Sequence, residues 1–484
     1  MSLGLVPTAA PPRASSVTPV PLVARLGIAL ASRGVRYCQW KGHGKRERWA
    51  NGRGDIDLLV DRTAWNDLTD VVGSLGFKLV LPPPGREAAG ITHFFGLDER
   101  TGQLVHLHVY QRLVIGSPWR THYQLPLERA LLESAQQSNV FKIAGPELEL
   151  IVLVLRQALR HELRDLLRRE PPRWMDGAIS ELDRLEDQVS RTAVIAALRK
   201  HLPAVSLDLF DQCRESLLPH SKAWRRVLAR ERLFRALSPH ASRASIFAPL
   251  ERLWERVRPL ITGGSEGHRL AGGGSVVALL GGDGSGKSTC ADALHTWLAS
   301  SLATMHVHLG RPPRTLATYV VGGLLAVVRR IGARTRLVSH LELLRYACTA
   351  RDRYAQYARA HRFASGGGIA ICERYPLPES WGLSGPSETQ GKGLEAQSRF
   401  AEAVRRWERR FYERMTAPDV LFVLHLDPET AVSRKPSEPA DYVRKRAQLT
   451  AETDWSNSGA RIVDAAQPLP QVVATLKAEL WSTL

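Results

Sequence analysis

A glycine-rich segment at residues 281–289 has the most specific spacing in this chain of residues suited to chemistry. Its sequence, GGDGSGKST, fits the pattern G-x-x-x-x-G-K-[ST], and it follows the apolar run 276–280. Glycines let successive backbone N–H groups turn toward phosphate oxygens, while the lysine adds a positive charge and the serine a hydroxyl ligand for Mg²⁺. The segment therefore predicts a strand, a phosphate-binding loop and a helix. A glycine-rich hairpin with a chance lysine is the alternative.

Each residue of this loop has a predicted part in holding a nucleoside triphosphate. We expect Lys287 to reach the β- and γ-phosphates and Ser288 to hold Mg²⁺. The positive end of the following helix faces the same anion. The predicted cofactors are ATP and Mg²⁺. The predicted ATP-binding residues are Gly281, Gly282, Asp283, Gly284, Ser285, Gly286, Lys287, Ser288 and Thr289.

Charged residues further along the chain could complete a site for phosphoryl transfer, which needs positioning and charge neutralisation more than covalent help. Glu373 could hold Mg²⁺ through water, and Arg374 could clamp an acceptor phosphate with two parallel bonds. The loop has no arginine, so we expect Arg434 to supply a catalytic cation from a basic cluster that we interpret as a mobile lid. The other members of this cluster are Lys435, Arg444, Lys445 and Arg446. A surface salt bridge at 373–374 and a solvated helix face in the cluster are the alternatives.

The segments that must position these residues alternate between strand-like and helix-like patterns after residue 275. This alternation predicts an α/β fold in which helices flank a parallel sheet. Apolar residues recur at helical spacing within 397–414 and predict a helix there. The predicted strands are 276–280, 305–309, 368–372, 420–426 and 461–463.

From about residue 276 to its end, the chain resembles the thymidylate kinase family of nucleoside monophosphate kinases. The matching segments, in the family's order, are GDGSGKST, ARDR at 350–353, IAICERY at 369–375, PDV with LDPE at 418–429, and VDAAQ at 463–467. The resemblance implies that Asp283, Arg353, Arg374 and Tyr375 lie near the acceptor nucleotide. It also implies transfer of the γ-phosphoryl group of MgATP to a nucleoside monophosphate such as dTMP, which would yield dTDP.

The chain departs from this family at three places, one of which is a long segment at 376–392 that is rich in Gly, Pro and Ser. The family's REPGGT stretch corresponds here to LGRPPRT at 309–315, and Glu373 replaces the usual aspartate. The acceptor therefore stays open between a nucleoside monophosphate, a sugar and a nucleic-acid 5′-end. A hypothesis from another class is a nucleotide-gated binding protein whose N-terminal domain is inactive.

The N-terminal part contains a second pair of residues suited to chemistry. Asp55 and Asp57 lie one residue apart on a predicted strand, so they share a face and could hold a divalent metal. With WKG at 40–42, the region 35–167 resembles the nucleotidyltransferase superfamily, which implies an α+β domain. His108 stands where that superfamily has a third carboxylate. His106 and His108 share one strand face and could touch a metal, although paired histidines at a sheet edge are more often structural. Two aspartates that only cap a strand are the alternative.

The length of 484 residues is too great for one core and indicates two or three domains. A net charge of +18 suits nucleotides and leaves nucleic acid or an acidic membrane surface open, although a preference for arginine on solvated helices would give the same charge. Oligomeric state is open, with a dimer among the possibilities. The predicted division is a disordered tail at 1–20, a nucleotidyltransferase-like domain at 21–125, a helical connector at 126–260, a glycine-rich linker at 261–275 and the kinase-like domain at 276–484.

Two further patterns bear on location. Five scattered cysteines without a C-x-x-C pair favour a reducing cytoplasm. The longest apolar stretch, 316–328, is too short to span a bilayer. We expect it to form a buried helix, with a helix on a membrane surface as the alternative, and we predict no transmembrane segment.

Overall fold

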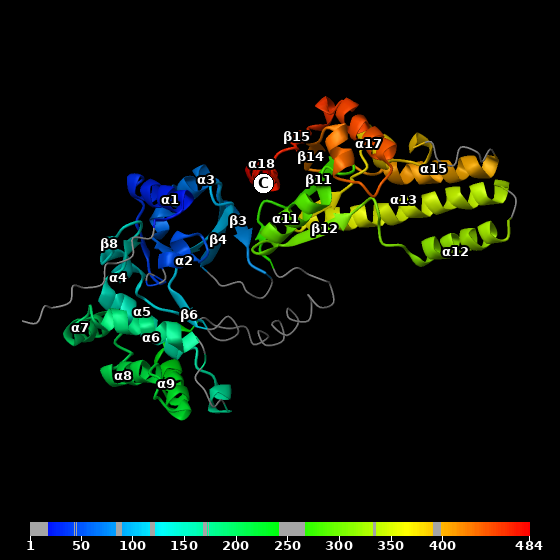
Figure 1. The fold of residues 1–484 in the computed structure, drawn as a ribbon. Helices are drawn as coiled ribbons and strands as arrows, with labels where there is room; N and C mark the ends of the chain where they lie inside the picture. The colour runs from blue at the N-terminus through cyan, green and yellow to red at the C-terminus, as the bar shows by residue number, and fades with distance from the viewer. Residues whose placement is uncertain are drawn as a thin grey trace, which may run out of the picture. The chain divides into compact units, whose positions relative to one another are not determined.

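The computed structural model describes residues 18–42, 44, 46–83, 90–116, 122–167, 172, 174–241, 267–332, 335–390 and 398–484. The chain divides into two compact units (Figure 1). The first comprises Met1–Phe77 with Ala89–Arg243, and the second Lys78–Ala88 with Ala244–Leu484. Most of the predicted tail (residues 1–17) and the first six residues of the predicted linker (261–266) lie outside the described residues, whereas residues 269–270 of that linker form a short strand.

The first unit combines a mixed sheet with helices. Its strands are β1 (Tyr37–Gln39), β2 (Ile56–Val60), β4 (Ile91–Asp98), β5 (Gln103–Tyr110), β6 (Val114–Gly116), β7 (His122–Gln124), β8 (Gln136–Gln137) and β9 (Lys142–Ile143). Its α-helices are α1 (Pro21–Ser32), α2 (Arg46–Ala50), α3 (Trp65–Ser74), α4 (Glu128–Glu133), α5 (Pro146–Ala158), α6 (Trp174–Glu186), α7 (Arg191–His201), α8 (Leu207–Ser216) and α9 (Ala223–Ala236).

Strand β2 lies inside the sheet of this unit, where the strand order is β4-β5-β2-β1-β9-β8. It runs parallel to β5, with Asp57 opposite His108, and antiparallel to β1. Every residue of β2 is buried, because apolar residues from both faces pack around it. This burial makes β2 a rigid base for the aspartate that it carries.

The helices of the predicted connector belong to this first unit. Helix α5 begins at Pro146, where proline is tolerated because its missing N–H would have no helical partner, and it is buried along almost its whole length. Its leucines and valines share one hydrophobic core with Cys38, Trp40 and Tyr110 of the sheet region. Helix α5 ends at Ala158 and a 3₁₀ helix follows at Leu163–Leu167. The position of α5 is therefore set by packing on the sheet, and the connector helices α6, α7, α8 and α9 pack in turn against α5.

The second unit contains a five-stranded sheet with the order β12-β13-β11-β14-β15. The strands of this sheet are β11 (Ser275–Gly281), β12 (Thr304–His308), β13 (Ile369–Glu373), β14 (Val420–His425) and β15 (Arg461–Asp464). The second unit also contains β3 (Lys78–Leu81), which pairs with β10 (Arg269–Leu270) outside this sheet. Its α-helices are α11 (Lys287–Ala299), α12 (Leu316–Arg330), α13 (Thr335–Ser365), α14 (Trp381–Ser384), α15 (Arg399–Glu413), α16 (Pro428–Ser433), α17 (Ala440–Glu452) and α18 (Leu469–Thr483).

All neighbouring strands of the five-stranded sheet run parallel, and β11 lies at its centre. Helices flank the sheet, as Figure 1 shows for α11, α13 and α17. The predicted fold class is confirmed, and each predicted strand of this region overlaps an observed strand. The parallel arrangement brings the carboxyl ends of β11 and β13 to the same edge, which is where the glycine-rich loop and Glu373 lie.

The apolar stretch at 316–328 forms α12, but the prediction that this helix is buried is wrong. Leu316 is 80% exposed, Val320 61% and Val327 55%, whereas Leu325 and Val328 pack toward α13. Apolar residues occur around most of this helix, and α13 covers one side of it. Within the part of the chain that the structure describes, no helix has both the length and the apolar character of a membrane span.

Candidate functional site

The glycine-rich loop of the second unit lies between the end of β11 and the start of α11. Gly281, Gly284 and Gly286 have positive φ angles of 148°, 86° and 83°, a conformation that residues with a side chain rarely adopt. A Cβ on Gly281 would lie 2.7 Å from the carbonyl oxygen of Leu424, and one on Gly284 would lie 2.7 Å from that of Ala431. The loop therefore requires these glycines both for its backbone conformation and for its packing.

Lys287 is the first residue of α11, and its side chain turns back into the loop. Its ammonium group donates a hydrogen bond of 2.5 Å to the carbonyl oxygen of Gly282. Burial, together with the positive charge of Arg374, lowers the pKa of Lys287 to about 8, although Asp283 acts in the opposite direction. Among the described residues, this buried cation has a neutral carbonyl as a hydrogen-bond acceptor, and such a cation is suited to binding an anion.

Ser288 and Glu373 meet beside the loop, as the sequence predicts. The Ser288 hydroxyl donates to Oε2 of Glu373 at 2.6 Å, and His306 Nε2 lies 2.9 Å from Oε1. Burial raises the pKa of Glu373, but the hydrogen bonds from His306 and Ser288 outweigh it and bring that pKa to about 2. The carboxylate is therefore ionised at neutral pH. A hydroxyl and a carboxylate oxygen side by side are ligands that Mg²⁺ prefers.

Two arginines converge on Asp283 of the loop. Arg374 Nη2 lies 2.6 Å from one carboxylate oxygen, and Arg446 Nε, from α17, lies 2.8 Å from the other. Arg374 has a φ of 54°, and it is the one non-glycine residue with positive φ in the described part of the chain. Such a conformation costs on the order of 1–3 kcal/mol and occurs often at functional sites. The packed surroundings thus hold Arg374 in a strained position that directs it to the loop.

Three other predicted site residues make their contacts elsewhere. Arg353 is buried and donates to the carbonyl oxygens of Leu309 and Ser384, and it also contacts the Tyr412 hydroxyl. Tyr375 is fully buried and donates to the carbonyl of Thr416.

Within the basic cluster, Arg434 donates to the carbonyl of Ala465, and it is Arg446 that reaches the loop. The sequence shows the basic cluster, but it does not indicate that Arg446 rather than Arg434 contacts the loop. His306 was also not predicted, because only the register of β12 beside β13 brings it to Glu373.

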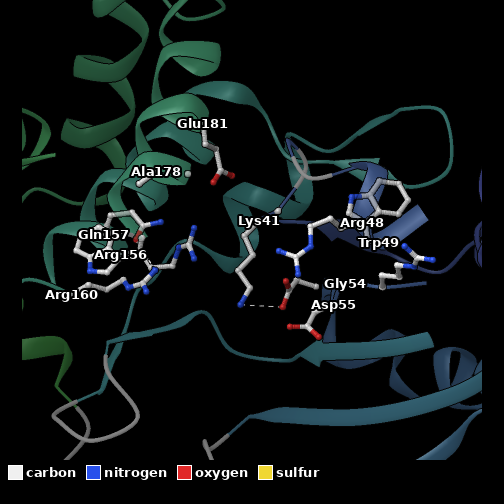
Figure 2. Close-up of a pocket in the computed structure, with 15 residues that line it drawn as sticks. Lys41, Arg48, Trp49, Gly54, Asp55, Arg156, Gln157, Arg160, Ala178 and Glu181 are labelled. Atoms are coloured by element: carbon white, nitrogen blue, oxygen red, sulfur yellow. Dashed lines mark hydrogen bonds and ion pairs between the residues drawn. The ribbon is translucent and has the colours of Figure 1, made fainter. Parts of the chain in front are cut away.

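A second site lies in the first unit, where segments around β2 and residues of α5 and α6 line an open cavity of about 530 Å³ (Figure 2). Five basic side chains and three acidic side chains line it. The basic ones are Lys41, Arg48, Arg53, Arg156 and Arg160, and the acidic ones are Asp55, Asp57 and Glu181. Figure 2 shows Arg156 and Arg160 on one side of the cavity, with Lys41 and Asp55 across from them.

An unpaired hydrogen-bond donor and a stacked guanidinium group favour an anion in this cavity. Nε of Arg156 is buried and has no hydrogen-bond partner among the described residues. The guanidinium group of Arg160 stacks 4.6 Å from the ring centre of Trp174 and donates to Gln157 at 3.2 Å. Guanidinium groups match phosphate oxygens in geometry as well as in charge. A phosphorylated ligand is therefore the type of molecule that this cavity suits.

The aspartates predicted to bind a metal already have partners in this unit. Asp57 accepts from Lys41 Nζ at 3.0 Å and from the Tyr110 hydroxyl at 3.1 Å, and it lies 3.2 Å from Nδ1 of His108. Burial raises the pKa of Asp57, but Lys41 and His108 outweigh it, so that this pKa is well below its usual value. Asp55 lies 3.0 Å from Nδ1 of His106. The two carboxylates are thus surrounded by cations and imidazoles, with His108 directly opposite Asp57.

These features define the second unit as an α/β protein of the P-loop class, because a central parallel strand, a glycine-rich loop with lysine and serine, and the following helix occur together. No protein-family model matches the chain. The chain is similar to the uncharacterized ATP-binding protein YghR of Escherichia coli (strain K12), with 27% identity over 218 residues, which cover 41% of this chain and 83% of YghR.

A second relative is the uncharacterized ATP-binding protein YghS of the same strain. The two chains are 25% identical over 232 residues, which cover 42% of this chain and 91% of YghS. Each relative therefore matches less than half of this chain over most of its own length.

Proposed function

We propose that the second unit is an ATP-dependent phosphotransferase that moves the γ-phosphoryl group of MgATP to a nucleoside monophosphate, with dTMP as the first acceptor to test. The observation that carries this proposal is that three features meet at one loop. They are Lys287, the Ser288–Glu373 pair, and the two arginines that form ion pairs with Asp283. The names of YghR and YghS, both of which are ATP-binding proteins, support the nucleotide-binding part.

Some residues of the site would neutralise the charge of the phosphates, and others would position the acceptor. Lys287 and the N–H groups of the loop would neutralise the triphosphate, and Ser288 and Glu373 would hold Mg²⁺, which when bound neutralises the phosphate oxygens during transfer. Arg374 would exchange Asp283 for the acceptor phosphate. Arg446 would stabilise the charge on the transferred group, and it replaces Arg434 in the role predicted from the sequence.

Nucleotides are the partners that we propose, and a cytoplasmic location fits the state of the cysteines. All five are buried and none forms a disulfide bond. Burial raises the pKa of Cys372 to about 12, which keeps this thiol protonated and unreactive. Binding to nucleic acid and formation of a dimer stay predictions from the sequence.

A direct test uses the full-length protein with γ-labelled ATP, Mg²⁺ and a panel of acceptors. The panel contains the nucleoside monophosphates, several sugars and an oligonucleotide with a free 5′-hydroxyl. We expect transfer to a nucleoside monophosphate and none to water alone. Transfer only to a sugar or to the oligonucleotide would overturn the proposed acceptor, and MgATP binding without transfer to any acceptor would overturn the proposed activity.

A second candidate function concerns the first unit, which we propose to be a binding module for a phosphorylated ligand and not an active nucleotidyltransferase. The observation that favours it is the position of His108, which occupies the place of a third carboxylate opposite Asp57. With Asp57 paired to Lys41, the oxygen ligands for a pair of Mg²⁺ ions are too few. The unpaired Nε of Arg156 supports binding of an anion instead.

A further inference from the structure

Three histidines meet on one face of the sheet in the first unit. His106 and His108 lie two residues apart on β5, so they point to the same side, and His93 on β4 lies directly opposite His108. The ring centres of His106 and His108 are 4.1 Å apart, and those of His93 and His108 are 4.6 Å apart. One coordinating nitrogen from each ring lies within 4.8 Å of the others. The rings are half-buried, so their positions are defined by packing.

The two aspartates orient two of these rings. Asp55 lies 3.0 Å from Nδ1 of His106, and Asp57 lies 3.2 Å from Nδ1 of His108. An ionised carboxylate can only accept a hydrogen bond, so Nδ1 carries a proton in both rings, and in the neutral imidazole Nε2 then carries the lone pair. A histidine that donates one ring N–H to a carboxylate and offers the other nitrogen is the usual arrangement around protein-bound zinc.

The spacing between two of the nitrogens matches a metal ion. Two nitrogens that each lie about 2.0–2.1 Å from one tetrahedral ion are roughly 3.3–3.4 Å apart. His93 Nδ1 and His106 Nε2 are 3.3 Å apart. Because Nε2 of His106 has the lone pair, His93 must donate to it in the metal-free protein. A metal ion between the two nitrogens would take the place of that proton, and one ring nitrogen of His108 lies within 4.8 Å of the other two ligand nitrogens.

We propose that His93, His106 and His108 bind one divalent transition-metal ion, with Zn²⁺ as the best match. Imidazole nitrogens favour zinc and its neighbours in the transition series, whereas Mg²⁺ favours oxygen ligands. Asp55 and Asp57 then hold the imidazoles and do not themselves bind the metal, which differs from their role predicted from the sequence. The proposal is independent of phosphoryl transfer in the second unit.

Three nitrogen ligands leave a fourth position on a tetrahedral ion. Water or an oxygen of a bound anion can occupy it. Asp55 and Asp57 also line the basic cavity of this unit, so the metal would add positive charge near the cavity in which Arg156 and Arg160 lie. The histidine site and the cavity would in that case act on the same phosphorylated ligand.

The test uses the full-length protein after removal of metals with a chelator. Zinc chloride is titrated in a calorimeter, and Co²⁺ is titrated in an absorption spectrometer, where tetrahedral nitrogen ligation gives intense visible bands. We expect one Zn²⁺ per chain, a tetrahedral Co²⁺ spectrum and no displacement of either ion by millimolar Mg²⁺. The variants His106→Gln and His108→Gln should lose both signals, whereas His220→Gln, which changes an exposed histidine of the same unit, should keep them.

Asp55→Asn separates a metal site from a structural cluster without disturbing the core, because the Asp55 side chain is 54% exposed. Loss of a carboxylate that orients a histidine ligand should weaken Zn²⁺ binding by about 10–100-fold, which a merely structural cluster would not show. The proposal is overturned if the wild type binds no Zn²⁺, or if His108→Gln binds it unchanged. It is equally overturned if Mg²⁺ displaces Zn²⁺ and Asp55→Asn abolishes Mg²⁺ binding, since the aspartates would then be the ligands.

Discussion

Each unit of this protein has a site with a lysine near buried carboxylates, but the two sites are built from different parts of the chain. In the second unit one continuous loop surrounds Lys287, and the hydrogen-bond acceptor of its ammonium group is the Gly282 carbonyl. In the first unit Lys41 contacts Asp57 and the Tyr110 hydroxyl, which come from two different strands. A lysine bonded to a neutral carbonyl can exchange it for phosphate more easily than one bonded to a carboxylate. In the function that we propose, Lys287 would bind the ligand directly, whereas Lys41 mainly neutralises Asp57.

The largest expected effect follows from removing the loop lysine. Lys287→Ala should lower kcat for phosphoryl transfer by about 10²–10³-fold, since one preorganised cationic donor to the reacting phosphates is lost. The measurement is steady-state transfer from γ-labelled ATP to the acceptor identified in the screen. The control is Lys477→Ala, which removes a lysine of the same unit on α18. Equal rates for Lys287→Ala and the wild type would show that the loop does not hold the transferred phosphate.

The two arginines of the basic cluster give the next effect. Arg446→Ala should lower kcat by about 10²-fold, because Arg446 lies 2.8 Å from Asp283 of the loop. Arg434→Ala should mainly lower stability, by about 0.5–1.5 kcal/mol, because its hydrogen bond goes to the Ala465 carbonyl. Transfer rates and thermal unfolding of both variants separate these effects. If Arg434→Ala is the slower enzyme, the cation predicted from the sequence is the correct one.

Much of the second unit was predictable because the backbone conformation of its loop requires glycines at fixed positions, and these can be read from the sequence. Gly281 and Gly284 appear in the sequence for the same reason that the structure requires them, since a side chain would meet the carbonyl oxygens of Leu424 and Ala431. The alternating strands and helices likewise indicated the parallel sheet. What the sequence did not show is which residues from distant segments meet there. Arg446 and His306 reach the loop only through the packing of α17 and the register of β12.

The first unit was less predictable because its site consists of side chains from separate elements. The pattern of Asp55 and Asp57 indicated a metal, but the three-dimensional pairing of β2 with β5 gives them histidine partners. Arg156 carries no motif, and it lines the cavity because α5 packs beside the sheet. Local patterns of one or two residues do not encode such tertiary contacts.

The arginines of this cavity give a smaller effect, measured as binding. In a Lys287→Ala background, which removes the loop site, the full-length protein should still bind inorganic tripolyphosphate. Replacing Arg156 and Arg160 with alanine should weaken this binding by about 10–100-fold, because hydrogen bonds to charged groups are lost. Calorimetry at low salt measures the affinity, and Arg225→Ala, an exposed arginine on α9, is the control. Unchanged affinity in the double replacement would place the anion outside the cavity.

The smallest effect is a pH dependence that also separates the two lysines. Burial lowers the pKa of Lys287 from 10.5 to about 8 in the folded protein. Between these two values the unfolded chain binds more protons than the folded one, so Lys287 makes the free protein more stable as pH rises through this window.

The affinity for MgATP changes with pH in the opposite direction, because above pH 8 the neutral amine must first gain a proton. We expect the affinity to fall by about tenfold from pH 7 to pH 9. Lys287→Arg, which stays charged, should remove both the pH dependence of stability and the pH dependence of MgATP affinity over this range. Lys41→Arg should leave both dependences unchanged, because that residue does not belong to the loop. A wild-type affinity that stays constant over this range would show that Lys287 does not change its protonation when the nucleotide binds.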